Sequence, residues 1–389
     1  MRIVFACMTY FCFTSLSYAQ CGGSFSNFVE GLKTEASDFG YRRQDIQAFF
    51  GNVTQDPKVL KADRNQGVFQ KDFIAFSSML ISEYRMVHGI KNATKHSIIF
   101  QEIELAYGIP AGVLLAFWAF ETDFGANQGS FNTLNALVTL AHDCRRPELF
   151  RPQVFAALEL SRRGGFNALE TKGAWAGEIG MIQMLPQDIL ENGFDGDGDG
   201  KVDLQNSVAD ALFTGSRMLN RMGWEPGGPW LQEITVPYDL DWSSTGVGKP
   251  KSIAEWKSQG VRGRNESLSS NQTKVSVVLP VGHKGPAFLA YPNFDVYFEW
   301  NQSLVYVTTA AYFANRLLGA PPYDAGIPEP GLKSAEMKTL QKKLQLRGHD
   351  VGDVDGILGA KTRAAVQFEQ QRLGLPADAW PTITLLIQL

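Results

Sequence analysis

Hydrophobic residues recur at helical spacing along most of the chain, and the pattern changes in its second half. Residues 20–100 show helical patterns separated by polar turns, and residues 101–225 hold the densest helical signals. Residues 226–300 are instead rich in Gly, Pro and Trp, with short β-like runs such as TKVSVVLP. Residues 301–319 return to a helical pattern that ends at a glycine. These patterns predict a mainly α fold, formally α+β, with a small β-containing segment.

One helix is apolar on every side and ends at a carboxylate. Residues 113–120 (VLLAFWAF) carry no polar side chain, and Glu121 follows them. Such a helix is buried in a domain core, and Pro110 suits its first turn. Burial, the negative end of the helix dipole and nearby Asp123 would raise the pKa of Glu121 and keep it protonated as a general acid. The alternative is that Glu121 points into water. Asp123 itself is expected to point away from Glu121.

The C-terminal part of the sequence reads as a separate unit. Residues 320–331 (APPYDAGIPEPG) are rich in Pro and Gly and predict a linker between separable domains. The remaining residues, 332–389, have a helical pattern of their own. A chain of 389 residues is long enough for two or three domains. We therefore expect one large domain over residues 20–319 and a small helical module after the linker.

The N-terminus predicts export from the cytoplasm. Residues 1–19 have the features of a cleaved signal peptide: Arg2, then an apolar stretch, then a small-x-small ending at Ala19. A membrane anchor is the alternative, but the apolar run is shorter than the roughly 20 residues that a span needs. Cys21 and Cys144 remain after cleavage, and two cysteines in an exported chain predict one disulfide. The alternative is two unpaired thiols.

Charge and motif content exclude several classes of function. The formal net charge is −4, which argues against nucleic-acid binding through general phosphate attraction. The sequence also contains no Gly-rich nucleotide loop, no zinc-ligand cluster and no Ser-His-Asp arrangement, and it has only five histidines.

An acidic, glycine-rich segment predicts a calcium site. Residues 195–206 (DGDGDGKVDLQN) have the spacing of an EF-hand-like loop, but Asn206 replaces the usual final glutamate. Asp210 could supply the missing carboxylate. The other expected ligands are Asp195, Asp197, Asp199, Lys201 through its carbonyl, and Asp203. We expect a structural calcium ion with no part in the chemistry, and the alternative is a solvated acidic turn.

Three segments together resemble the membrane-bound lytic transglycosylase B family. They are YGIPAGVLLAFWAFETDFGANQGSFNTLNALVTLAHDCRRPELF, KGAWAGEIGMIQMLPQDIL and DGDGDGKVDLQNSVADAL, and the resemblance covers about residues 25–320. It implies a lysozyme-like core that cleaves the MurNAc–GlcNAc bond of peptidoglycan without water and leaves 1,6-anhydro-MurNAc ends. It also implies that Glu121, in ETDFG, is the single acid/base. Glu121 would protonate the glycosidic oxygen and then take the proton of the MurNAc 6-hydroxyl.

The resemblance also implies substrate-binding residues in the middle of the chain. Gln183, in GMIQMLP, matches a substrate-contacting Gln, and the alternative is a buried Gln bonded to backbone. Arg145 and Arg146, in DCRRPELF, match paired arginines near the saccharide and peptide, and the alternative is a surface ion pair.

A second group of implied site residues lies near the end of the large domain. The segment FEWNQSLVY matches an element that carries a conformationally important aromatic residue, an Asn and a Tyr, here Trp300, Asn301 and Tyr306. Two positions depart from the family pattern. Ala174 stands where some members have Ser, and Trp300 where some have Tyr, so neither is credited with a hydroxyl contact.

Residues 336–389 resemble the peptidoglycan-binding domain type 1, a three-helix module that would tether the enzyme to the wall. The resemblances imply a periplasmic monomer that acts on peptidoglycan glycan strands, with other cell-wall enzymes as candidate partners. A muramidase is one alternative, but it needs a second carboxylate or a positioned water, and neither is evident in the sequence. An inactive wall-binding scaffold is another, and Glu121 and Gln183 argue against it.

Overall fold

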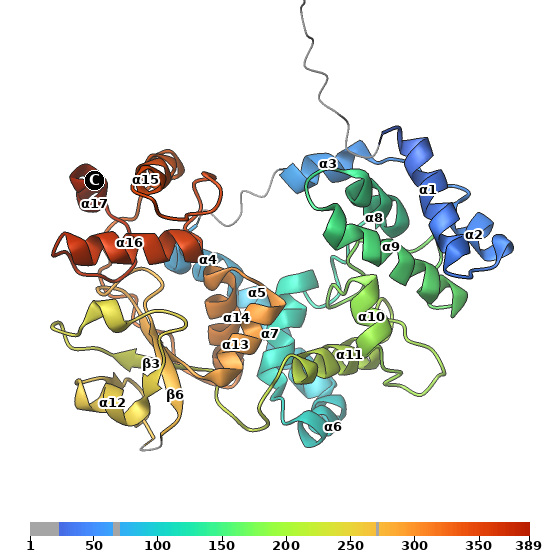
Figure 1. Ribbon diagram of the computed structural model, residues 1–389. Helices are drawn as coiled ribbons and strands as arrows, with labels where there is room; N and C mark the ends of the chain where they lie inside the picture. Colours follow the sequence, from blue (N-terminus) through green and yellow to red (C-terminus); the bar gives the residue numbers. More distant parts are fainter. Residues whose placement is uncertain (1–22, 65–70, 270–271) are drawn as a thin grey trace, which may run out of the picture.

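The computed structural model describes residues 23–64, 71–269 and 272–389, which form a mainly helical protein (Figure 1). The helices of the first half are α1 (Phe25–Asp38), α2 (Arg43–Phe50), α3 (Pro57–Arg64), α4 (Phe73–Leu80), α5 (Glu83–Lys95), α6 (Ser97–Tyr107), α7 (Ala111–Thr122), α8 (Thr133–His142), α9 (Pro147–Arg162), α10 (Pro186–Asn192) and α11 (Val208–Arg221). The later helices are the 3₁₀ helix η2 (Trp242–Ser244), α12 (Ile253–Ser258), α13 (Pro292–Trp300), α14 (Leu304–Leu317), α15 (Ser334–Leu346), α16 (Ala360–Arg372) and α17 (Ile383–Gln388).

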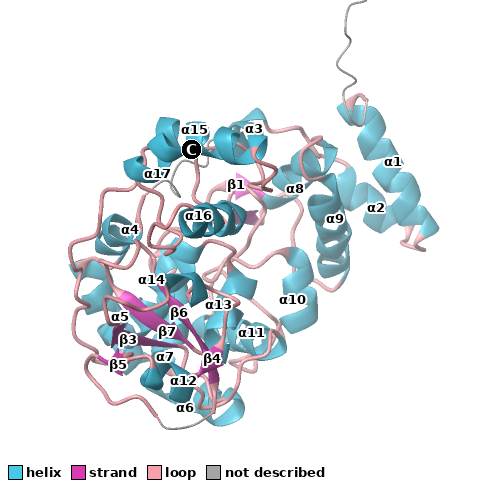
Figure 2. Cartoon of the chain, turned by 60° about the vertical axis from the view of Figure 1, so that its left-hand side comes forward, coloured by secondary structure: helices cyan, strands magenta, loops and turns pink. Residues whose placement is uncertain are grey.

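The strands form two antiparallel sheets. Strands β1 (Phe131–Asn132) and β2 (Lys172–Gly173) make a small ribbon. The larger sheet has the order β4-β6-β7-β3-β5, and its strands are β3 (Leu231–Thr235), β4 (Lys251–Ser252), β5 (Arg262–Gly263), β6 (Lys274–Val278) and β7 (Ala287–Ala290). This sheet lies within residues 226–300, the predicted β-containing segment. Figure 2 draws its strands β3 to β7 in magenta.

The larger sheet separates two cores because successive side chains of a strand point to opposite faces. Val277 pairs with Leu289, and both belong to a core closed by Trp256 of α12. Val278 pairs with Phe288, and both belong to the main helical core. Both faces of the sheet are therefore buried, which explains the nearly continuous apolar run of β6.

Helix α7 lies in the middle of the main core, as its all-round apolar sequence predicts. Residues 112–119 are all buried, and the helix packs against α5 and α14 (Figure 1). The preceding helix α6 ends at Gly108, whose φ of +62° gives the left-handed turn that starts α7 in a new direction. No single helix among the described residues is long and apolar enough to cross a membrane. Among the described residues, only α6 and α7 taken together have the length and composition of a candidate membrane span, and the two helices are bent by 116° relative to each other.

The C-terminal module has its own small core, and it also packs against the large domain. Helices α15, α16 and α17 meet around Leu340, Val366 and Leu385. Trp380 of the module belongs to the main core of the large domain, and so does Tyr323 of the predicted linker, as a partly buried residue packed against it. Most of residues 320–331 is exposed, although Tyr323 packs against the large domain. That the two domains are separable stays a prediction.

Polar contacts hold the same interface together. Gln367 on α16 donates from Nε2 to the carbonyls of Trp242 and Thr245, at 3.1 and 3.0 Å. Asp378 accepts from the backbone N–H of His283 at 3.0 Å and lies 2.6 Å from its Nδ1. These groups are buried or nearly so, and each hydrogen bond contributes more to stability here than an exposed hydrogen bond would. Removing the module would therefore leave buried polar groups of the large domain unpaired.

Candidate active site

The C-terminal end of α7 presents Glu121 and turns the chain sharply behind it. Asp123 and Phe124 both adopt left-handed backbone angles, with φ of 50° and 61°. Their N–H groups bond back to the carbonyls of Ala119 and Trp118, at 3.0 and 3.2 Å, and so close the helix. The side chain of Asp123 accepts from Arg85 on α5 at 2.7 Å. Asp123 is thus occupied by an ion pair, in keeping with the expectation that it does not act beside Glu121.

Two donors from distant parts of the chain hold one oxygen of Glu121. Oε1 accepts from the hydroxyl of Tyr306 at 2.5 Å and from the indole Nε1 of Trp300 at 3.1 Å. Trp300 is itself fixed by stacking on Phe117, one helical turn before Glu121, with ring centroids 4.3 Å apart. Because Oε1 already accepts two hydrogen bonds, a proton on this carboxyl group belongs on the other oxygen, Oε2.

The surroundings tune Glu121 to the working range of a general acid. Burial raises the pKa of Glu121 to about 7, and the hydrogen bonds from Tyr306 and Trp300 act in the opposite direction. The nearby carboxyl group of Glu178 raises the pKa further. The neighbouring charge expected from Asp123 therefore comes from Glu178. A pKa near neutrality suits a group that must donate a proton and then take one back.

Glu121 opens onto a cavity of about 360 Å³. The residues that line it are Glu121, Ala174, Trp175, Glu178, Gln183, Met184, Leu185, Asp188, Met218, Trp300 and Asn301. The expectation of a lone carboxyl group is wrong for this cavity, because Glu178 and Asp188 also line it. The sequence held one signal that was missed: Glu178 is the single charged residue in the otherwise apolar and glycine-rich run AWAGEIGMIQML.

Gln183 combines features of both alternatives considered for it. Its Nε2 donates to the backbone carbonyls of Gly180 and Gln128, at 2.8 and 3.3 Å, so the backbone holds the side chain. The same residue lines the cavity and has a left-handed φ of 52°. Such strain in a non-glycine residue is costly and is concentrated at functional sites. Thr122 ties this loop to α7 through a 2.5 Å bond from its hydroxyl to the carbonyl of Met181.

The two arginines and Asn301 occupy different surroundings. Arg145 and Arg146 both pair with Asp63 on α3, whose side chain is 1% exposed, and neither lines the cavity. The arginines thus form an ion pair, but its carboxylate is buried and not at the surface as the alternative had it. Their contact with substrate stays a prediction. Asn301 does line the cavity, and its Oδ1 accepts from the N–H of Ser303 at 2.9 Å. The structure thus brings Gln183, Trp300 and Asn301 together around Glu121 but not the arginines.

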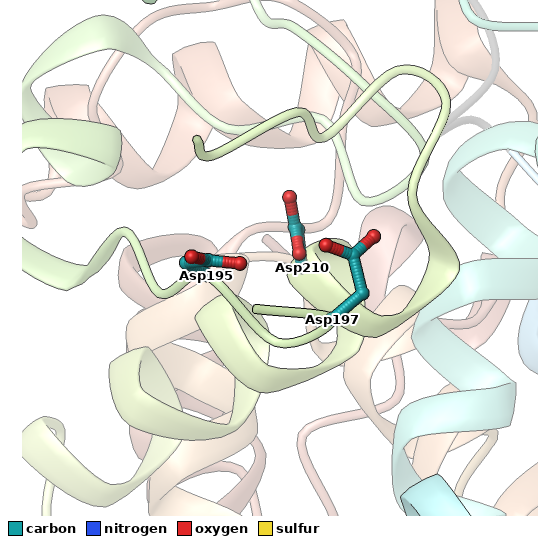
Figure 3. A group of neighbouring side chains, drawn as sticks. All are labelled: Asp195, Asp197 and Asp210. Atoms are coloured by element: carbon teal, nitrogen blue, oxygen red, sulfur yellow. The ribbon is translucent and has the colours of Figure 1, made fainter. Parts of the chain in front are cut away.

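The acidic loop brings together three of its predicted ligands. Carboxylate oxygens of Asp195, Asp197 and Asp210 lie within 4.8 Å of one another. Figure 3 shows the three side chains grouped at the loop. Asp210 is buried and accepts from the backbone N–H groups of Gly196 and Asp203, at 2.8 and 2.7 Å. The other predicted ligands, Asp199, Lys201 and Asp203, do not belong to this group of three.

Two predictions concern the N-terminal residues. Cys144 is disulfide-bonded. Its predicted partner, Cys21, lies outside the described residues, so the pairing stays a prediction. The predicted signal peptide, residues 1–19, also lies outside the described residues.

Comparison with known families identifies the fold and the family of the chain. The sequence profile of the transglycosylase SLT domain matches residues 24–315, which is most of the chain. The chain belongs to this transglycosylase family. A second profile, for the putative peptidoglycan binding domain, matches residues 333–385 of this transglycosylase. The lysozyme-like helical fold and the C-terminal helical module are therefore confirmed.

Individual relatives agree with this assignment. The structure of SltB3 from Pseudomonas aeruginosa in complex with NAG-anhNAM-pentapeptide is 34% identical, covers 94% of this chain and 99% of its own, and has a TM-score of 0.87. The membrane-bound lytic murein transglycosylase B of Escherichia coli K12 is 22% identical over 303 residues, which is 74% of this chain and 82% of the relative. Slt35 of Escherichia coli, solved in complex with calcium, shares the fold at 22% identity and a TM-score of 0.66. The protein is thus a peptidoglycan lytic transglycosylase.

Proposed function

We propose that this lytic transglycosylase uses Glu121 as its only acid and base. In the first step the proton on Oε2 passes to the glycosidic oxygen, the bond from MurNAc C1 to that oxygen breaks, and GlcNAc leaves with a 4-hydroxyl. In the second step the MurNAc 6-hydroxyl attacks C1, and Glu121 takes its proton. The products are a free GlcNAc end and a 1,6-anhydro-MurNAc end, and Glu121 is protonated again. The observation that carries this proposal is the carboxyl group of Glu121, raised in pKa to about 7 at a cavity wall.

The two donors to Oε1 have a defined part in this cycle. Glu121 is negatively charged only between the two steps, and the hydroxyl of Tyr306 and the indole N–H of Trp300 then stabilise its charge. The 6-hydroxyl needs no separate site because it belongs to the sugar that it attacks, and an intramolecular attack gains a large entropic advantage over water. Gln183 and Asn301 face the same cavity and are proposed as contacts for the sugar. For Arg145 and Arg146 we propose only a contact with the part of the peptidoglycan glycan strand that lies outside the cavity.

A hydrolytic outcome would require one of the other carboxyl groups to act as a base for water. Glu178 is one candidate because it lines the same cavity and acts on Glu121 electrostatically. Burial raises the pKa of Glu178, and its Oε2 has no hydrogen-bond partner among the described residues that would orient the group toward a water molecule. Asp123, the other neighbour, is bound to Arg85. The anhydro product therefore fits the site better than the hydrolysed one.

The acidic loop is proposed to hold a structural calcium ion. Its donor set consists of carboxylate oxygens, which hard cations such as Ca²⁺ prefer. Asp195, Asp197 and Asp210 present three negative charges within 4.8 Å, and the buried Asp210 joins the loop to the first turn of α11. A cation there would relieve this repulsion and stabilise the loop. Asp199, Asp203 and the carbonyl of Lys201 would need to turn toward the ion to complete its shell.

The C-terminal module is proposed to bind peptidoglycan and to raise the local concentration of substrate. A family of wall-acting enzymes and a wall-binding module suggest a periplasmic or cell-wall location. Export by a cleaved signal peptide and a Cys21–Cys144 disulfide complete this proposal, and we keep other cell-wall enzymes as candidate partners of a monomer.

The test of the central proposal is Glu121→Gln. The amide keeps the shape of the side chain but cannot cycle a proton, a role worth typically 10²–10⁴-fold in rate. Digestion of purified sacculi, followed by mass spectrometry of the released muropeptides, should show that loss. The wild-type products should each weigh one water less than hydrolysed ends. Asp188→Asn is the matched control, since it makes the same change in the same cavity and should cost far less. Near-normal cleavage by Glu121→Gln would show that another group is the acid.

A further inference from the structure

Glu178 is a buried, uncompensated carboxyl group in the cavity of Glu121. Its Oε2 is buried and has no hydrogen-bond partner among the residues that the structure describes. The backbone N–H groups of Glu178 and Ala176 donate hydrogen bonds to the carboxyl group of Glu178. The cation that attracts this carboxyl group, Arg146, is already paired with Asp63. An unpaired polar atom in such a place is expensive, so it calls for a functional explanation.

The loop that carries Glu178 is held rigidly against the rest of the site. The N–H of Ala174 bonds to the carbonyl of Glu178 at 2.9 Å, and Ile179 pairs with Met184 across the loop. A Cβ on Gly173 would lie only 2.0 Å from the carbonyl oxygen of Glu178, so only glycine allows strand β2 to approach so closely. The hydroxyl of Thr122, next to Glu121, bonds the same loop at Met181. Glu178 is therefore fixed relative to Glu121.

We propose that Glu178 is a positioning residue that keeps the proton on Glu121 until the glycosidic oxygen takes it. The proposal rests on Glu121 being the acid, as proposed above. Two carboxyl groups in one poorly solvated cavity cannot both ionise without a large repulsion, so the pair holds one proton over a wide pH range. Glu178 neither touches the reacting atoms nor gains or loses a proton overall in the reaction.

The other groups around Glu121 do not supply this effect. They are Tyr306 on α14 and Trp300 on α13, which donate to Oε1; Arg85 on α5, which is paired with Asp123; and Asp188 on α10, which shares the cavity. Burial raises the pKa of Glu121 most, the two donors lower it, and Glu178 is the neighbouring carboxyl group whose charge adds to the rise. Burial raises the pKa of Asp188, but the charge of Asp188 has no resolved effect on Glu121. Asp188 is therefore a matched control for Glu178.

The test is the pH dependence of kcat/KM for Glu178→Gln on soluble glycan strands. The rate falls with rising pH as Glu121 loses its proton. Without the neighbouring charge this alkaline limb should move to lower pH by about one unit, the usual threshold for coupled groups. The variant should then be about tenfold slower than wild type at pH 8 and nearly equal at pH 5. Asp188→Asn should leave the limb in place, and Glu178→Ser replaces Glu178→Gln if melting curves show that the amide is poorly folded.

Three results would overturn the proposal. The limb could stay in place in both Glu178 variants, or it could move equally in Asp188→Asn. Hydrated MurNAc ends could also appear with the wild type and vanish with Glu178→Gln, which would make Glu178 a base for water. An active Glu121→Gln would instead remove the acid assigned to Glu121, so failure of that assignment is distinguishable from failure of the role of Glu178.

Discussion

Replacing Tyr306 by Phe should move the alkaline limb of activity in the direction opposite to Glu178→Gln. The hydroxyl of Tyr306 donates to Oε1 of Glu121 at 2.5 Å and lowers the pKa of Glu121. A hydrogen bond to a charged group is worth about 1.5–3 kcal/mol, and about 1.4 kcal/mol corresponds to one pKa unit. Trp300 still donates at 3.1 Å in the variant, so we expect the smaller effect. The limb should rise from near pH 7 by about one unit.

The same change should slow the reaction at its optimum. Glu121 carries its charge between the two proton transfers, and the variant stabilises that charge with one donor instead of two. A loss of about 1.4 kcal/mol in that state corresponds to about tenfold in rate. The assay is the initial rate of anhydro-muropeptide release between pH 4 and 9. Tyr306→Phe should therefore give a slower enzyme whose activity extends to higher pH.

A matched control is available in the same core. Tyr297 is also buried and stacks on Phe117, but its hydroxyl has no hydrogen-bond partner among the described residues. Tyr297→Phe should leave both the limb and the rate in place. The reasoning is wrong if Tyr306→Phe moves the limb to lower pH or not at all, or if Tyr297→Phe has the same effect.

Four further predictions concern stability and assembly. Because the pKa of Glu121 rises from 4.5 to about 7 on folding, the wild type should lose up to about 3 kcal/mol of stability as the pH rises through that window; denaturant unfolding of Glu121→Gln should show no such loss. Calcium should raise the melting temperature by a few degrees, and Asp195→Ala should abolish the rise. Thiol titration of the denatured, unreduced mature protein should find no free thiol if Cys21 and Cys144 are paired. Deleting residues 332–389 should weaken sedimentation with sacculi more than turnover of soluble strands, and should also lower the melting temperature, because buried contacts are lost.

The sequence alone determined the features that depend on local spacing. Residues 113–120 are apolar on every side, so the helix had to be buried whatever surrounds it, and Glu121 had to lie near the buried end. The regular spacing of Asp195 and Asp197 in a glycine-rich loop brings their carboxylates together for the same local reason, and Asp210 follows within one turn of the next helix.

Tertiary structure alone decided which groups meet Glu121. Tyr306 and Trp300 lie about 180 positions further along the chain, and only the packing of α7 against α13 and α14 shows that both donate to the same oxygen. Glu178 sits in a loop with no periodic pattern, so no spacing rule places it in the cavity. Contacts between residues far apart in sequence depend on how whole elements pack against one another, and short-range patterns carry no information about that packing.

The same reason explains why the sequence did not reveal the contacts of Tyr323 and of the two arginines. A Pro- and Gly-rich composition describes how a segment behaves when nothing covers it. Within residues 320–331, Tyr323 finds a partner in Phe73 of the large domain, and Trp380 of the module belongs to the main core. Asp63 draws Arg145 and Arg146 together from another helix, at a distance of more than 80 positions. In each case the local sequence determined which contacts the residues are able to make, and the fold determined which partners they contact.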